Sequence, residues 1–78
     1  MPRRKSTTQP IRDWIGTRIR EIRETMGLTQ LAASSRAGLD QSTWSKYERG
    51  EREPPLSQLQ RIATGLGVPM ERLVESPT

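Results

Sequence analysis

Apolar side chains recur at helical spacing over the first patterned stretch of the chain. They are separated by four, four, three and four residues, so they form one stripe on a helix of 3.6 residues per turn: Ile11, Ile15, Ile19, Ile22 and Met26. Gly27 follows directly and suits a helix C-terminus. The pattern predicts a helix over residues 13–26. Gly16 is expected to weaken it by up to about 1 kcal/mol relative to alanine.

Two short helices separated by a glycine turn follow. Thr29 is a good N-cap for a helix over residues 30–36. Gly38 can supply the positive φ that a tight turn requires. Asp40 then suits the N-cap of a further helix over residues 41–48. This layout, with small polar side chains at the start of the later helix, is typical of a helix that enters the major groove of DNA.

A proline pair separates these helices from the rest of the pattern, because Pro54-Pro55 cannot lie inside a helix. A fourth helix is predicted to begin at residue 55 or 56 and to end before Gly67. Its expected buried positions are Leu56, Leu59, Ile62, Ala63 and Leu66. Residues 68–74 form a short fifth helix, and no segment alternates as a strand does. The predicted fold is all-α and compact, with five helices in one domain over residues 11–74.

The charge is distributed unevenly along the 78 residues. The net charge is +4, and three of the cations, Arg3, Arg4 and Lys5, fall in the first ten residues. The remainder carries ten basic and nine acidic groups. Residues 1–10 lack an apolar period and are predicted to be a disordered basic arm. The arm either contacts DNA phosphates or a minor groove, or is a frayed terminus without a role. Residues 75–78 are expected to be a tail.

Composition excludes several function classes. The chain has no cysteine and no histidine, so disulfides, most zinc sites and catalysis by either residue are ruled out. We expect no enzymatic activity, no catalytic residue, no metal and no cofactor. No apolar run approaches the roughly 20 residues that span a membrane, and no export signal follows the basic start. The predicted location is the cytoplasm, with no membrane partner.

Several motifs at matching spacings resemble the lambda-repressor-like helix-turn-helix family, also called Cro/C1-type or XRE-type. The resemblance covers residues 15–74, which is nearly the whole predicted domain. The motifs are Leu28-Thr29-Gln30, Ala37-Gly38-Leu39, Gln41-Ser42-Thr43, Ser45-Lys46-Tyr47-Glu48-Arg49-Gly50 and Leu66-Gly67-Val68. The family implies a five-helix domain that binds double-stranded DNA, in a protein of bacterial or phage origin that is associated with the nucleoid.

Three positions depart from the family pattern. Ala33 stands where the family usually has a large aliphatic residue, and Trp44 replaces the usual isoleucine, so the indole is expected to compensate the lost volume. Ser34 replaces an alanine, and its hydroxyl can bond back to a carbonyl of the preceding turn. Trp14, Trp44 and Tyr47 are expected in the core and not as a stacking platform for single strands.

The first turn of the third predicted helix carries the expected base readers. Gln41 suits adenine, because its amide can donate to N7 and accept from the N6 amino group. Ser42 can pair with several bases. Lys46, on the same face, could reach guanine or a phosphate, and the sequence does not choose between them. Thr43 lies near that face too and is assigned to phosphate, although a base contact is equally compatible with its position.

Other residues are expected to contact phosphates or to support the fold. The resemblance implies that Gln30 contacts a phosphate, and Arg49 and Arg52 are expected to clamp the backbone. The resemblance also implies an ion pair between Arg23 and Glu48 that locks the first helix to the third and does not read DNA. Arg18 and Arg36 are expected to be solvated.

The predicted function is a sequence-specific transcriptional regulator that occupies an operator, as a homodimer on a palindromic site. The fifth helix is the candidate dimer surface, through Met70, Leu73 and Val74, although these residues could equally close the core. The alternative is an antitoxin or protein-interaction adaptor with the same fold. Possible protein partners are accordingly a toxin or RNA polymerase. The sequence identifies neither the operator nor the direction of regulation.

Overall fold

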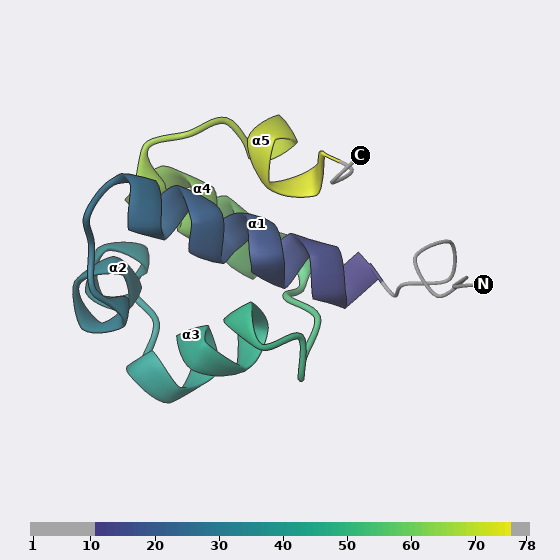
Figure 1. The fold of residues 1–78 in the computed structure, drawn as a ribbon, viewed down its shortest axis with the longest axis horizontal. Helices are drawn as coiled ribbons and strands as arrows, with labels where there is room; N and C mark the ends of the chain where they lie inside the picture. The colour runs from purple at the N-terminus through teal and green to yellow at the C-terminus, as the bar shows by residue number, and fades with distance from the viewer. Residues whose placement is uncertain (1–10, 76–78) are drawn as a thin grey trace.

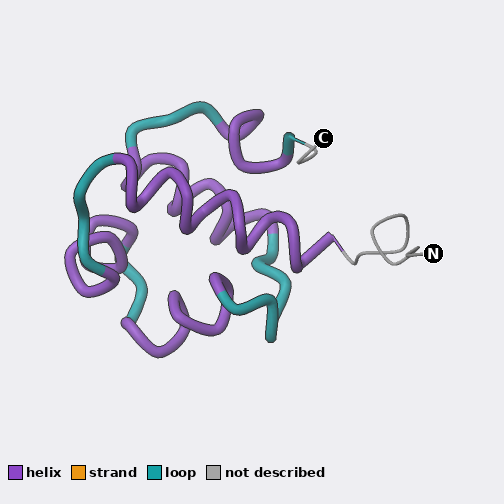
Figure 2. Tube along the Cα trace, viewed as in Figure 1, coloured by secondary structure: helices purple, strands orange, loops and turns teal. Residues whose placement is uncertain are grey.

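The computed structural model describes residues 11–75 of the chain. This part contains five helices and no strand (Figure 2). The helices are α1 (Ile11–Thr25), α2 (Gln30–Ala37), α3 (Gln41–Glu48), α4 (Leu56–Leu66) and α5 (Met70–Val74). The predicted all-α class and helix order are confirmed, and the predicted ends differ by one or two residues. The N-terminal arm and residues 76–78 lie outside the described range.

The helices surround α1, which runs through the middle of the fold (Figure 1). In that view α2 and α3 lie on one side of α1, α5 lies on the other, and α4 passes behind. α2 packs against α4 and α3, while α1 packs against α3 and α5, and α4 also contacts α5. α3 therefore rests on α1 and α2 through one face and leaves its opposite face open.

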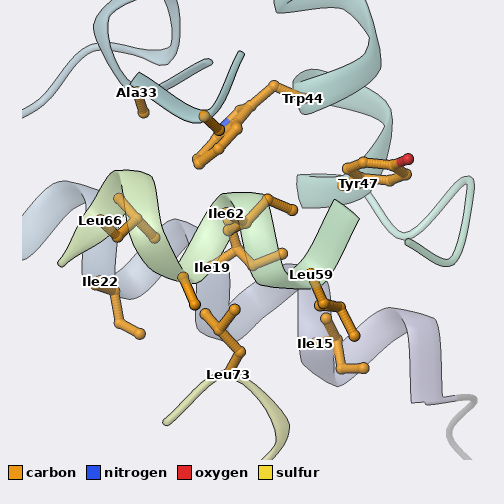
Figure 3. Packing of buried hydrophobic residues seen from close by; sticks show 12 residues of the cluster. Ile15, Ile19, Ile22, Ala33, Trp44, Tyr47, Leu59, Ile62, Leu66 and Leu73 are labelled. Carbon is orange, nitrogen blue, oxygen red and sulfur yellow. The ribbon is translucent and has the colours of Figure 1, made fainter. Parts of the chain in front are cut away.

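The residues of α2 and α3 that depart from the family pattern lie in the core. Trp44 and Ala33 are both fully buried, and the indole lies between α2 and α4 (Figure 3). The large side chain of α3 thus fills space beside the small side chain of α2, as expected from conservation of core volume. Ser34 is also buried, and its hydroxyl donates to the Leu31 carbonyl at 3.0 Å. That bond satisfies the hydroxyl as predicted.

Two apolar residues expected in the core are exposed. Met26 is 41% exposed, because α1 ends at Thr25 and Met26 belongs to the following turn. Leu56 is 64% exposed. As the first residue of α4 it precedes the buried face of that helix, which begins at Leu59.

Gly16 is required by packing, which corrects the prediction that it is only a weak point of α1. A Cβ at this position would lie 2.2 Å from the Tyr47 carbonyl oxygen and 3.0 Å from that of Glu48. These are backbone atoms at the end of α3 and cannot move aside as a flexible side chain can. The absence of a side chain at residue 16 therefore allows α1 and α3 to approach closely.

The short α5 is held to α1 by an arginine that we expected to be solvated. Arg18 donates through Nε to the Arg72 carbonyl at 2.8 Å, and through Nη2 to Glu75 at 2.8 Å. Arg18 thus satisfies a carbonyl of the last turn of α5, which has no partner within the helix. Leu73 is fully buried in the core of its own chain. Among the three residues assigned to a dimer surface, only Val74 is exposed, at 41%.

Candidate nucleic-acid interface

Local capping fixes the angle between α2 and α3. The Thr29 hydroxyl accepts a hydrogen bond from the Ala32 amide at 3.0 Å and begins α2. α2 ends at Gly38, which has φ 73° and donates its amide to the Ser35 carbonyl. A residue with a Cβ is strained in this left-handed conformation, so glycine suits the turn. Asp40 caps the start of α3 two residues later.

The two sides of α3 differ in character. Trp44, Tyr47 and Glu48 are buried against the rest of the domain. The side chains on the open face are exposed and polar: Gln41, Ser42, Lys46 and Arg49. All three predicted base readers, Gln41, Ser42 and Lys46, are therefore accessible from outside the domain.

The start of α3 is organised by the Asp40 carboxylate. It accepts hydrogen bonds from the Ser42 hydroxyl at 2.5 Å, the Thr43 hydroxyl at 2.8 Å and the Thr43 amide at 3.3 Å. These bonds lower the pKa of Asp40 to about 2, the Ser42 hydroxyl first among them. With their protons directed to Asp40, the Ser42 and Thr43 hydroxyls present oxygen lone pairs outward.

A single buried carboxylate joins α1, α2 and α3. Glu48 accepts from Arg23 Nε at 2.5 Å and Arg23 Nη2 at 3.0 Å, and from Trp44 Nε1 at 2.6 Å. It also accepts from Gln30 Nε2 at 2.9 Å. Burial alone would raise the pKa of Glu48, but the hydrogen bonds from Arg23, Gln30 and Trp44 outweigh it and lower the pKa. The implied pair of Arg23 and Glu48 is present, and it is the centre of a larger network.

Gln30 is not a freely exposed surface residue. Its side chain is half-buried and one amide hydrogen is directed to Glu48. The second hydrogen of the same nitrogen is available to another acceptor. Gln30 also borders a shallow depression of about 230 Å³ between α1, α2 and α3. The residues around it are Arg20, Arg23, Gln30, Ser45, Glu48 and Arg49.

The cations near the end of α3 differ in their partners. Arg49 forms an ion pair with Glu51, with 2.7 Å between Arg49 Nε and Glu51 Oε2. Hydrogen bonding to Glu51 raises the pKa of Arg49. Lys46 and Arg52 are exposed, and neither has an ion pair within the range that the structure describes. Arg52 lies on the loop between α3 and α4.

Two residues of this site were missed by sequence reasoning. Trp44 was assigned to packing alone, although an indole four residues before a glutamate on one helix could have indicated its N–H bond to Glu48. Arg20 also borders the depression, and its Nε lies 3.4 Å from Glu24 Oε2. Nothing in the sequence places Arg20 beside the start of α2, because that proximity depends on how α1 and α2 pack.

Two caps, a glycine turn and an open polar face on α3 define a helix-turn-helix protein. The sequence profile described as "Helix-turn-helix domain" matches residues 14–75. The chain belongs to this family, whose members are DNA-binding regulators and not enzymes. The chain is 37% identical over 68 residues to an uncharacterized HTH-type transcriptional regulator, y4dJ, of Sinorhizobium fredii, covering 87% of each chain.

Solved structures show the same fold. The restriction-modification controller protein C.AhdI from Aeromonas hydrophila has a TM-score of 0.75 and 33% identity, over 81% of this chain and 92% of that chain. The P22 c2 repressor, solved in complex with a synthetic operator, has a TM-score of 0.73 and 27% identity, over 81% and 96% of the two chains. Both are regulators, in agreement with the lambda-repressor-like family that the motifs resembled. Within residues 11–75, no helix is long and apolar enough to cross a membrane.

Proposed function

We propose that this protein is a sequence-specific, double-stranded DNA-binding transcriptional regulator that acts by occupying an operator. The observation that carries the proposal is the open face of α3, where Gln41, Ser42 and Lys46 are exposed together beyond a capped glycine turn. A helix with this surface fits the major groove, in which each base pair presents a distinct set of donors and acceptors.

Base recognition is assigned to the first half of α3. Gln41 can form two hydrogen bonds with adenine through its amide. The Ser42 hydroxyl donates to Asp40, so its oxygen would accept a hydrogen bond from a base amino group, on cytosine or adenine. Lys46 stands one turn after Ser42 and would reach guanine or a phosphate from the same face. Thr43, half-buried beside Asp40, is assigned to phosphate.

Phosphate contacts are assigned to the depression beside α2 and to the loop after α3. Gln30 would offer its second amide hydrogen to a phosphate, and the start of α2 would attract the same anion, as helix N-termini do. Arg49 at the rim and Arg52 on the loop would clamp the backbone. Arg3, Arg4 and Lys5 of the basic arm would add contacts outside the described residues.

We further propose that two copies bind a palindromic site. One α3 reads only a few base pairs, whereas two recognition helices about 34 Å apart multiply the specificity. The domain organisation proposed for each copy is the arm of residues 1–10, the DNA-binding domain of residues 11–74 and the tail of residues 75–78. The exposed side chain of Val74 supports a contact with the second copy at α5. Operator occupancy would then block or recruit RNA polymerase according to where the site lies.

The test is selection of bound duplexes from a random library at about physiological salt. A palindromic consensus would support a sequence-specific dimer and would give the half-site spacing. A consensus without symmetry would support base reading and contradict the dimer. Recovery of unselected sequences would contradict sequence-specific regulation and would favour the protein-partner alternative, for which a toxin is the first candidate.

A further inference from the structure

An acidic side chain lies among the cations that are assigned to DNA at the end of α3. Arg49 donates to Glu51 through two nitrogens, Nε at 2.7 Å and Nη2 at 3.2 Å. The two side chains are each 53% exposed, so the pair lies at the open surface. This planar, two-bond arrangement is also how a guanidinium binds a phosphate. In the free protein, Glu51 therefore binds the Arg49 guanidinium, which is the group that we assign to a phosphate of the DNA backbone.

The backbone holds Glu51 in this position. Gly50 has φ 74° and donates its amide to the Tyr47 carbonyl, and the Glu51 amide donates to the Lys46 carbonyl at 2.9 Å. These two bonds form a Schellman-type cap that fixes the first loop residues against the last turn of α3. Arg49 also donates to the Ser45 hydroxyl, which keeps the guanidinium along the open face. The pair is therefore part of the helix end and not a chance contact of two long side chains.

Glu51 also acts on Lys46. The pKa of Glu51 is lowered by its hydrogen bond with Arg49 and by the charges of Arg49 and Lys46. The carboxylate thus lies within the field of both cations on this part of α3. Arg49, which contacts the carboxylate directly, loses most of its attraction for phosphate, whereas Lys46 experiences only the general effect of a nearby opposite charge, which the charge control below also measures.

We propose that Glu51 is an intramolecular competitor of DNA phosphate, which neutralises Arg49 in the free protein and is displaced when the backbone takes its place. The inference rests on the proposed DNA-binding function. Its consequence is weaker binding to every duplex by a common factor, because phosphate contacts carry no sequence information. The number of counterions released from the DNA stays nearly the same, since Arg49 neutralises the same phosphate once Glu51 is displaced.

Glu53 provides a matched control for charge. It lies on the same loop and is exposed, and its carboxylate has no ion pair within residues 11–75. Glu51→Gln and Glu53→Gln change the net charge equally, but only the first releases Arg49. Any difference between the two variants therefore reports the pair and not the overall charge.

The experiment measures fluorescence anisotropy of a labelled random-sequence duplex and of a selected operator, at several salt concentrations. We expect Glu51→Gln to tighten binding by roughly three- to tenfold on both duplexes, with little change in the slope of log K against log salt, because Arg49 neutralises the same phosphate in both proteins. Glu53→Gln should give a clearly smaller gain. With Arg49→Gln as the background, Glu51→Gln should give no more than Glu53→Gln does. Thermal unfolding should be unchanged in all these variants.

Three outcomes would overturn the inference. They are equal gains from Glu51→Gln and Glu53→Gln, a Glu51→Gln gain that persists without Arg49, and a gain on only one of the two duplexes. Absence of binding by every variant would instead refute the proposed function itself. In the free protein, NMR titration of Glu51 should show its pKa rising in Arg49→Gln. An unchanged titration would contradict the pair without reference to DNA.

Discussion

Glu48→Ala tests whether the buried carboxylate network holds the DNA-binding helix in place. The Glu48 side chain is 3% exposed and that of Arg23 is 12% exposed. Four hydrogen bonds from three residues on α1, α2 and α3 converge on this carboxylate. Its removal leaves the Arg23 guanidinium and the Trp44 N–H, both largely buried, without their main acceptor.

The expected loss is large relative to the stability of a small domain. Removal of one partner of a buried ion pair costs about 3–5 kcal/mol, because the other charge remains buried and uncompensated. A domain of this size has a total stability of about 5–15 kcal/mol. At about 4–8 °C per kcal/mol, the unfolding temperature should fall by at least roughly 12 °C.

Circular dichroism during heating and urea titration would measure the loss, with Glu24→Gln as the matched control. Glu24 is 3.8 Å from Arg23 but 56% exposed, so its loss should change stability by no more than about 0.5 kcal/mol. The double variant Arg23→Met with Glu48→Met should recover part of the loss, because it leaves no buried charge. A Glu48→Ala protein that unfolds within a few degrees of the Glu24→Gln protein would refute the role of the network.

Four other perturbations test separate parts of the structure. Gly16→Ala should destabilise by about 1–3 kcal/mol despite the better helix propensity of alanine, because its Cβ would meet backbone oxygens of α3; a stabilised protein in urea titration would contradict the close approach. Gln41→Ala should lose roughly 1–3 kcal/mol of binding on the selected operator and relax the preference at one base, whereas an equal loss on random DNA would argue against base reading. Deletion of residues 1–5 should weaken binding to all duplexes and flatten the salt dependence, and an unaltered slope would mean that the arm makes no phosphate contacts. The folded-state pKa of Glu48 lies below its ordinary value near 4.5, so the stabilisation from this carboxylate is present above that value and is lost as the pH falls through the lowered pKa. Urea midpoints measured from about pH 6 to pH 2 should therefore fall less steeply for Glu48→Gln than for the unaltered protein. Parallel pH curves for the two proteins would exclude this contribution.

The sequence by itself determined the helices and their order. Thr29 and Asp40 accept amides of their own helices, and Gly38 adopts the left-handed conformation at the turn. These interactions join residues only a few positions apart, so spacing and residue type are sufficient to predict them. The open face of α3 followed from the same periodicity, because the buried aromatic residues leave the polar ones on the opposite side.

Tertiary packing decided which side chains share a site. Glu48 receives Gln30 and Arg23 from two other helices, and the periodicity within one helix carries no information about such distances. Gly16 weakens an isolated helix, but in the folded domain a side chain at this position would collide with the backbone at the end of α3. Leu56 fitted an apolar helical pattern, yet it is exposed because the packed part of α4 begins three residues later. Local chemistry fixes the elements of this protein, whereas the burial and partners of a side chain depend on how those elements pack.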